Sequence, residues 1–272
     1  MKTRLLFAAG IFAFLICCNR QPESREQIPA QGQPETVSIG FVTLNSFPHD
    51  TNSFTEGLFY HDGKLYESTG ATKELPQTKS LYGIVDPVTG KINIKAELDG
   101  NEYFGEGIAL LNNKIYQLTW RSKIGFIYDA ATFKKTGEFI LPVEEGWGLT
   151  TDGTNLVMSD GTNNLTFLEP GQLQPVKTIS VSENGYATDY LNELEYVNGF
   201  IYANVWTTNK IVKINPQDGK VAGTIDLSPI AEDAKNSYPG SLEMNGIAYD
   251  PAENKFVITG KMWPRFYEIK IK

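Results

Sequence analysis

Two glutamates that are each followed directly by glycine are the residues of this sequence best suited to acid–base chemistry. Glu56 lies in Phe54-Thr-Glu-Gly and Glu106 lies in Phe104-Gly-Glu-Gly. Three further segments match them in context: Glu145-Gly-Trp147-Gly, Leu191-Asn192-Glu193-Leu and Met244-Asn245-Gly-Ile. Carboxylates brought together repel one another, which raises the pKa of at least one and suits it to act as general acid or base.

These segments recur because the chain after residue 37 contains five related units. Asp-Gly, Asn-Gly and Asn-Asn turns separate short alternating runs, a pattern typical of β-hairpins, and no long stretch of helical periodicity occurs. The units repeat about every 45 residues, which is the length of a propeller blade with roughly four short strands. The second strand of each unit is marked by an apolar pair: Leu65-Tyr66, Ile115-Tyr116, Leu156-Val157, Ile201-Tyr202 and Phe256-Val257.

The repeats predict an all-β fold, a five-bladed β-propeller over residues 37–272. A strand at Val37–Leu44 precedes the first unit, and we expect it to close the ring by pairing as an outer strand with the last blade, which ends at Lys272. An irregular β-sandwich whose turns are evenly spaced by chance is the alternative. We expect the protein to be a monomer.

The inner strands of a propeller run along its central channel, so their starts meet at one opening. We therefore expect a ring of Glu56, Glu106, Trp147, Asn192 or Glu193, and Asn245. Trp120 and Trp206 each follow a second strand and should lie near the same end, whereas Trp263 comes later. Glycines beside the acids allow close approach of backbone and ligand. The alternatives are blade packing for the tryptophans and hydrogen bonding between blades for the Glu-Gly pairs.

The composition limits the chemistry further. The chain has 32 acidic and 24 basic residues and a net charge of −8, which argues against nucleic-acid binding. Its histidines are His49 and His61, and its cysteines are Cys17 and Cys18. These are too few for a Cys/His zinc site or a disulfide framework. We predict no cofactor and no metal in the reaction, while a structural calcium ion stays open.

The first 36 residues are typical of a targeting segment and a tether. Lys2 and Arg4 precede an apolar run, Leu5–Ile16, that is too short to cross a bilayer. The run ends in Leu15-Ile16-Cys17-Cys18, which resembles a bacterial lipoprotein processing site with Cys18 lipidated. We expect a signal peptide at 1–18, a flexible tether at 19–36, and an exported protein, periplasmic or at the cell surface, that is anchored through Cys18. An ordinary signal peptide is the alternative.

Taken together, the blade motifs resemble the glutaminyl-peptide cyclotransferases of the plant and bacterial type. The resemblance extends from about residue 38 to 272 and includes a motif from every blade. It also implies a five-bladed propeller unrelated to the zinc-dependent animal enzymes. The segments that carry it are Phe47-Pro-His-Asp, Phe54-Thr-Glu-Gly-Leu, Phe104-Gly-Glu-Gly-Ile, Trp147-Gly-Leu-Thr-Thr-Asp-Gly, Leu191-Asn-Glu-Leu-Glu-Tyr, Ala203-Asn-Val-Trp, Met244-Asn-Gly-Ile-Ala-Tyr and Gly260-Lys-Met-Trp-Pro.

This resemblance implies a reaction in which the N-terminal glutamine of a peptide or protein loses ammonia and closes to pyroglutamate. It implies that Glu106 is catalytic. Plant sequences have Gln where this chain has Glu56, so the extra carboxylate leaves open whether Glu56 or Glu106 carries the proton, or whether Glu56 binds the substrate's ammonium. The family pattern places in the substrate pocket Phe54, Glu56, Phe104, Trp120, Trp147, Asn192, Trp206 and Lys261.

Such a ring closure requires two things of the protein: holding the substrate in a folded-back conformation and transferring a proton. Nucleophile and electrophile belong to one residue, so a pocket that holds the side chain folded back supplies proximity. The α-amine has a reference pKa of about 8, and the harder task is to deliver a proton to the departing nitrogen. We assign that shuttle to Glu106. Asn192 or a tryptophan N–H is expected to polarise the carbonyl that is attacked.

Three other functions fit parts of the sequence. A lipid-anchored propeller could bind a peptide or sugar at the channel mouth without catalysis, because the fold alone does not determine function. A carbohydrate-active enzyme could use Glu56 and Glu106 as its carboxylate pair. Ser/His/Asp hydrolysis is less favoured, since neither His49 nor His61 lies in a strand-start motif.

Overall fold

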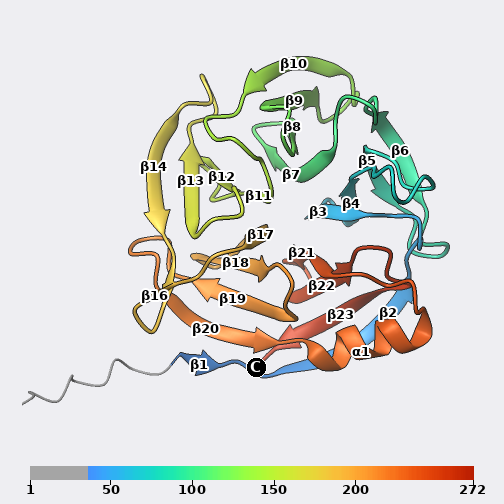
Figure 1. Cartoon of the computed structure of the whole chain (residues 1–272), viewed down its shortest axis with the longest axis vertical. Helices are drawn as coiled ribbons and strands as arrows, with labels where there is room; N and C mark the ends of the chain where they lie inside the picture. The colour runs from blue at the N-terminus through green and yellow to red at the C-terminus, as the bar shows by residue number, and fades with distance from the viewer. Residues whose placement is uncertain (1–35) are drawn as a thin grey trace, which may run out of the picture. The chain divides into compact units, whose positions relative to one another are not determined.

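The computed structural model describes residues 36–272, in which five β-sheets of four or five strands are arranged as a ring, with one further two-stranded sheet (Figure 1). This confirms the predicted five-bladed β-propeller. The expected signal peptide, Cys18 and all but the last residue of the expected tether lie outside the described residues. No helix within residues 36–272 is long and apolar enough to cross a membrane.

Each of the first three blades takes four consecutive antiparallel strands from the centre of the ring outward. The first blade contains β3 (Thr55–His61), β4 (Lys64–Thr69), β5 (Leu81–Val85) and β6 (Ile92–Glu97). The second contains β7 (Gly105–Leu111), β8 (Lys114–Thr119), β9 (Ile124–Asp129) and β10 (Lys135–Ile140). The third contains β11 (Leu149–Thr151), β12 (Leu156–Ser159), β13 (Asn164–Leu168) and β14 (Pro175–Ser180).

The last two blades include strands from the N-terminal side of the propeller. The fourth contains β17 (Leu191–Val197), β18 (Phe200–Val205), β19 (Lys210–Ile214) and β20 (Val221–Asp226), and the short β1 (Val37–Ser38) pairs with β20 in parallel. The fifth contains β21 (Met244–Asp250), β22 (Lys255–Gly260), β23 (Arg265–Ile271) and, outermost, β2 (Phe41–Pro48). A small hairpin, β15 (Ser182–Glu183) and β16 (Tyr186–Ala187), lies between the third and fourth blades in sequence.

The expected ring closure is present, with shifted boundaries. β2 pairs antiparallel with β23 along its length, from Phe41 opposite Ile271 to Pro48 opposite Arg265. The predicted strand Val37–Leu44 is therefore wrong at both ends, because Val37 and Ser38 pair with the neighbouring fourth blade instead. The short connection between β1 and β2 lets one N-terminal segment pair with two adjacent sheets, the fourth blade through β1 and the fifth through β2.

One helix, α1 (Ser228–Ser237), corrects the expectation that the units contain no helix. It connects the fourth blade to the fifth and turns only Ile230 and Ala234 into the protein, so its helical period is too short to stand out in the sequence. A proline in the first turn fixes φ at a helical value and favours the start. The helix packs on the apolar core that also contains Trp263.

The inner strands β3, β7, β11, β17 and β21 contact one another in order around the centre of the ring. Glycines after the functional positions permit this close approach. A Cβ added to Gly107 would lie 2.4 Å from the amide nitrogen of Leu149, and one added to Gly148 would lie 2.0 Å from the carbonyl oxygen of Asn192. Gly107 N–H also donates to the Trp147 carbonyl, at 2.7 Å. The glycines therefore serve contact between blades as well as space for a ligand.

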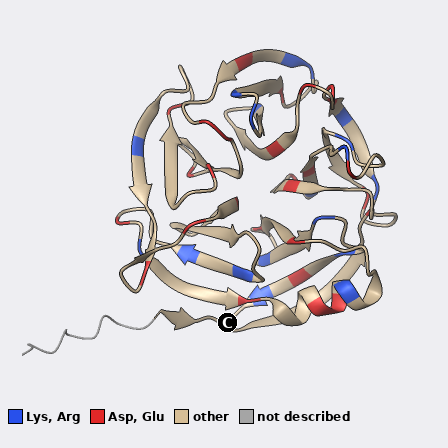
Figure 2. Cartoon of the chain, in the orientation of Figure 1, with Lys and Arg blue, Asp and Glu red and all other residues tan. Residues whose placement is uncertain are grey.

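Two acids of β17 connect these inner strands at the centre, and we call Glu193 and Glu195 the hub. Glu193 is fully buried; its Oε1 accepts the Leu58 N–H at 3.1 Å and its Oε2 accepts the Ile247 N–H at 2.7 Å. Oε1 of Glu195 accepts the Tyr249 N–H at 2.9 Å. Figure 2 shows acidic positions on inner strands, among them β3, β7 and β17. The hub thus joins the fourth blade to the first and fifth through carboxylate–backbone hydrogen bonds.

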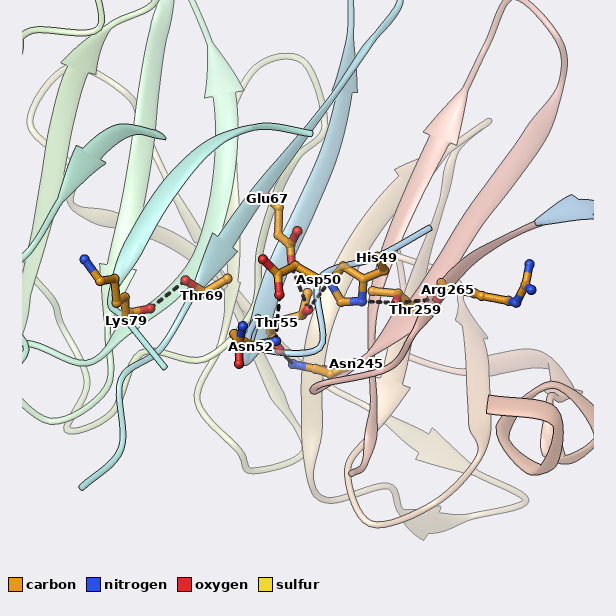
Figure 3. A network of polar contacts seen from close by, with 10 residues as sticks. All are labelled: His49, Asp50, Asn52, Thr55, Glu67, Thr69, Lys79, Asn245, Thr259 and Arg265. Carbon is orange, nitrogen blue, oxygen red and sulfur yellow. Dashed lines mark hydrogen bonds and ion pairs between the residues drawn. The ribbon is translucent and has the colours of Figure 1, made fainter. Parts of the chain in front are cut away.

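A second buried network lies where the fifth blade meets the first, beside the closure (Figure 3). His49, just after β2, is 2.9 Å from Oε1 of Glu67 on β4 through its Nε2 and 3.1 Å from the Thr259 hydroxyl through its Nδ1. The Thr55 hydroxyl donates to the same Glu67 oxygen at 2.7 Å. His49 is therefore part of the joint between blades.

Candidate active site

A pocket of about 400 Å³ opens where the inner strands begin, a size usual for small-ligand sites. The structure brings together here all nine residues that the sequence analysis singled out for catalysis and substrate binding, and it adds Thr72 and Glu74. The pocket is lined by Phe54, Glu56, Thr72, Glu74, Phe104, Glu106, Trp120, Trp147, Asn192, Trp206 and Lys261.

Irregularities at the starts of the inner strands position the polar residues. The pairing register of β3 shifts between Thr55 and Gly57, so that Glu56 occupies the irregular position. The same shift occurs around Glu106 in β7, around Asn192 and Glu193 in β17, and around Asn245 in β21. An extra residue in a strand redirects side chains, and such bulges are frequent next to active sites. In four blades, a β-bulge at the start of the inner strand thus places a carboxylate or amide residue at the same end of the channel.

Aromatic rings form the walls of the pocket and meet edge to face. Phe104 contacts Phe54 with ring centroids 5.9 Å apart and Trp120 at 5.8 Å, and Trp147 contacts Trp206 at 5.6 Å. Phe104 lies directly over Gly70, where an added Cβ would lie 2.1 Å from the ring. Such walls can hold a short side chain by shape, which is what a folded-back substrate requires.

Glu56 is held by a cation and an amide. Its Oε1 accepts a hydrogen bond from Nζ of Lys261 at 2.7 Å in an ion pair, and its Oε2 accepts one from Nδ2 of Asn245 at 2.9 Å. The same Lys261 Nζ lies 4.6 Å from the centroid of the Phe54 ring. Burial raises the pKa of Glu56 to about 7, although Lys261 opposes the rise. The ion pair joins the first blade to the fifth.

Glu106 has a different environment. The residue is 5% exposed, and its Oε2 has no hydrogen-bond partner within residues 36–272. Burial raises the pKa of Glu106 well above its usual range; the charge of Glu56 adds to the rise, and Lys261 opposes it. An acid with a free oxygen and a raised pKa, in a pocket, is suited to exchange protons with a ligand.

The donors for a developing oxyanion are fewer than the sequence suggested. The indole N–H groups of Trp120 and Trp147 both donate to Oε2 of Glu145, at 2.8 and 3.0 Å, so they are already engaged. Asn192 lines the pocket, and its amide group carries the donor Nδ2 beside the buried acceptor Oδ1, which has no partner among the described residues. Of the groups predicted to polarise a carbonyl, Asn192 and the Trp206 N–H remain.

Several candidates from the sequence lie outside the pocket lining. Asn245 sits behind Glu56, Glu193 belongs to the hub, and Trp263 is buried with its N–H donating to the Leu242 carbonyl at 2.9 Å. His49 is in the joint between blades, and His61 ends β3 on the surface. Neither histidine lines the pocket, and Glu56 is engaged by Lys261, so neither Ser/His/Asp hydrolysis nor a free carboxylate pair fits this site.

Sequence reasoning missed the residues that connecting segments contribute. Thr72 and Glu74 come from the connection between β4 and β5, where the Thr72 hydroxyl donates to the Glu74 carboxylate. Glu145 comes from the connection between β10 and β11. Its place two residues before Trp147 was visible in the sequence, but the approach of Trp120 from another blade was not.

Comparison with known proteins identifies the family of this chain. The family model for glutamine cyclotransferase matches residues 11–271. A glutaminyl-peptide cyclotransferase from Arabidopsis thaliana is 41% identical over 228 residues, which is 83% of this chain and 69% of that protein. The crystal structure of Myxococcus xanthus glutaminyl cyclase superposes with a TM-score of 0.79 at 32% identity, covering 88% of this chain and 99% of the other. The expected resemblance is confirmed, and the chain belongs to the glutamine cyclotransferase family.

Proposed function

We propose that this protein is a glutaminyl-peptide cyclotransferase that converts the N-terminal glutamine of peptides or proteins to pyroglutamate and releases ammonia. Family membership supports the activity. The observation that carries it here is the pocket itself, in which Glu106 presents, between aromatic walls, a buried carboxyl with an oxygen that no described residue contacts by a hydrogen bond. A non-catalytic binding protein would not require that combination.

In the proposed reaction, the substrate's α-nitrogen attacks the carbonyl carbon of its own side-chain amide. A bond forms between these two atoms, and the bond from that carbon to the amide nitrogen breaks. Glu106, ionised at the start, takes the proton that the α-nitrogen loses and delivers it to the amide nitrogen, which leaves as ammonia. The proton count balances without a second acid. Because the acyl group is transferred to an amine, the protein is an acyltransferase.

The contacts favour Glu106 over Glu56 as the shuttle. Lys261 and Asn245 occupy both oxygens of Glu56, so a proton transfer there would first have to break an ion pair. Oε2 of Glu106 has no such partner in the described part of the chain. We assign Glu56 to holding Lys261 at the pocket wall and to raising the pKa of Glu106 through its charge.

Asn192 is assigned to the carbonyl oxygen on which negative charge develops. Its amide lines the pocket, whereas the N–H groups of Trp120 and Trp147 are bound to Glu145. A fixed donor aimed at a developing oxyanion is worth about 10²–10³ in rate. Trp206 completes the wall on the same blade as Asn192.

We propose that the reaction needs no metal ion. Both histidines lie away from the pocket, and Lys261 occupies the Glu56 carboxylate that would otherwise be the natural partner of Glu106 in a cation site. Prolonged dialysis against a strong chelator is expected to leave turnover unchanged. A loss that added divalent ions restore would contradict this part of the proposal.

Export and anchoring are proposed on the sequence alone. A basic start, an apolar run and Cys18 support a lipoprotein signal, which would hold a monomeric propeller at the periplasmic or cell surface. Cys18→Ala is expected to release the protein from the membrane fraction of the producing cell. If the native protein is absent from the membrane fraction, an ordinary signal peptide is the explanation, and an unchanged membrane fraction in Cys18→Ala would indicate another attachment.

The decisive experiment is incubation of purified protein with a peptide bearing N-terminal glutamine, followed by mass spectrometry. Loss of one ammonia per peptide, faster than in buffer alone, is expected. The same peptide with N-terminal asparagine serves as a matched control, because it lacks one methylene and cannot close a five-membered lactam. If several glutamine peptides show no loss with folded protein, the binding-protein alternative becomes the better explanation.

A further inference from the structure

Glu145 lies behind the tryptophan wall of the pocket and contacts both blades that build it. It belongs to the connection between β10 and β11, and it is not among the residues that line the pocket. One oxygen, Oε2, accepts the N–H of Trp120 at 2.8 Å and the N–H of Trp147 at 3.0 Å. Trp120 follows β8 in the second blade, whereas Trp147 leads into β11 of the third.

The other oxygen of Glu145 is occupied as well. Oε1 accepts the Nε–H of Arg121 at 2.7 Å, and the Arg121 guanidinium carbon lies 3.9 Å from the centroid of the Trp120 ring. Trp120 is therefore held at its edge by a hydrogen bond and on its face by a cation. These three donors outweigh the effect of partial burial and lower the pKa of Glu145, so its charge is permanent at neutral pH.

The need for such a support follows from the exposure of the rings. Trp120 and Trp147 are only partly buried, and each meets one other aromatic wall residue edge to face. Side chains that are free to change rotamer must be immobilised when a ligand binds, which reduces affinity. A shared acceptor fixes both indoles before the substrate arrives.

We propose that Glu145 is a positioning residue that sets the spacing and orientation of Trp120 and Trp147 and thereby preorganises the pocket for the folded-back glutamine side chain. This inference rests on the proposed function for its substrate. Glu145 touches neither substrate nor reacting atoms; it acts through the two rings. Because both N–H groups are engaged by Glu145, neither indole has an N–H left to donate to a ligand.

The test compares Glu145→Ala with the conservative Glu145→Gln. The glutamine carbonyl still accepts both indole N–H groups, and Arg121, whose side chain is 65% exposed, is free to turn into water. Alanine removes the acceptor. For a glutamine peptide we expect KM to rise about tenfold in Glu145→Ala with kcat changed less than threefold, and to stay within about twofold of the native value in Glu145→Gln.

A second readout uses the tryptophans directly. In Glu145→Ala the two freed indoles are expected to change the intrinsic fluorescence, and in Glu145→Gln the spectrum is expected to stay close to the native one. The neighbouring Glu144→Ala is the matched control, because Glu144 is exposed and, within residues 36–272, forms an ion pair only with Lys123 at the surface. It should change neither KM nor fluorescence. Glu145→Ser, whose hydroxyl is too short to reach the rings, replaces Glu145→Ala if that variant aggregates.

A native KM and native fluorescence in a folded Glu145→Ala protein would overturn the proposal. So would a Glu145→Gln variant as impaired as Glu145→Ala, because that result would assign the effect to charge instead of to the shared acceptor. If the native protein releases no ammonia from any glutamine peptide, the proposed function fails, while the fluorescence comparison still decides whether Glu145 holds the rings.

Discussion

The pocket and the hub are two regions of the same channel, and both bury glutamates whose pKa values are raised. Burial raises the pKa of Glu193 well above its usual range and that of Glu195 to about 8. In the hub, backbone N–H groups occupy both oxygens of Glu193, whereas Glu106 in the pocket keeps Oε2 unpartnered among the described residues. A perturbed acid is therefore a candidate for chemistry only where an oxygen remains free to meet a ligand.

The largest expected effect is a loss of turnover when the catalytic acid of the pocket is changed, a loss that changes in the hub should not cause. Glu106→Gln removes the only group assigned to carry the proton, so kcat is expected to fall by about 10²–10⁴ with the unfolding midpoint unchanged. Steady-state ammonia release and thermal unfolding measure the two quantities. If Glu106→Gln stays near the native rate, the shuttle lies elsewhere, and Glu56 is the next residue to change.

A change in the hub is expected to lower the free energy of unfolding and to leave turnover nearly unchanged. Glu193→Ala leaves the N–H groups of Leu58 and Ile247 buried without an acceptor, which costs about 1–3 kcal/mol for each group. Urea denaturation should show this loss, while the folded fraction keeps a near-native kcat. Glu106→Ala is the matched comparison and should lose much less stability. An equal loss of stability in both variants would contradict the structural role assigned to Glu193 alone.

The pH dependence of stability sharpens the comparison further. Burial raises the pKa of Glu195 to about 8 in the folded protein, against about 4.5 for a solvent-exposed glutamate, so the folded state holds more protons than the unfolded state between these values. The protonated Glu195 adds to the free energy of unfolding, and this addition is fully present below about pH 4.5. It is lost as the pH rises through about 8, and the free energy of unfolding falls by no more than about 1.4 kcal/mol per pH unit. Urea titrations from pH 5 to pH 9 should show a decline that is weaker in Glu195→Gln. A decline of the same slope in that variant would assign it to other groups.

The smallest expected effect concerns the second acid of the pocket. Glu56→Gln keeps an oxygen for the Asn245 amide but removes the charge that helps raise the pKa of Glu106. We expect kcat/KM to fall by less than about tenfold and the acidic limb of its pH profile to move to lower pH. A loss as deep as that of Glu106→Gln would make Glu56 part of the proton path.

The repeats made most of the fold and much of the site predictable. A blade position recurs at the same end of the channel, so Glu56, Glu106 and Asn192 could be placed together before any coordinates. The family resemblance placed Lys261 and Phe54 in the pocket; Lys261 belongs to no repeated motif, whereas Phe54 matches Phe104 of the next unit. Whether Asn192 or Glu193 faces the pocket stayed open, because the bulge at the start of β17 decides it and alternation alone does not.

What the sequence did not reveal depends on segments that meet only in the folded ring. α1 has two buried residues, which are too few to give a recognisable helical period in the sequence. β1 pairs with the fourth blade, whereas one continuous strand on the last blade was expected. Glu145 acts through rings from two different blades, a relation that no spacing along the chain encodes. Contacts between blades were therefore the main part of the structure that could not be predicted from the sequence.

The Glu56–Lys261 ion pair has a consequence for the order in which this protein is made. Glu56 belongs to the first blade and Lys261 to the last, and the outer strand β2 pairs with the late strand β23. Contacts between such distant parts of a chain form late in folding. The chain must be free to fold through Lys261 before the pocket has its cation, so a partly formed chain has no complete active site until the ring closes.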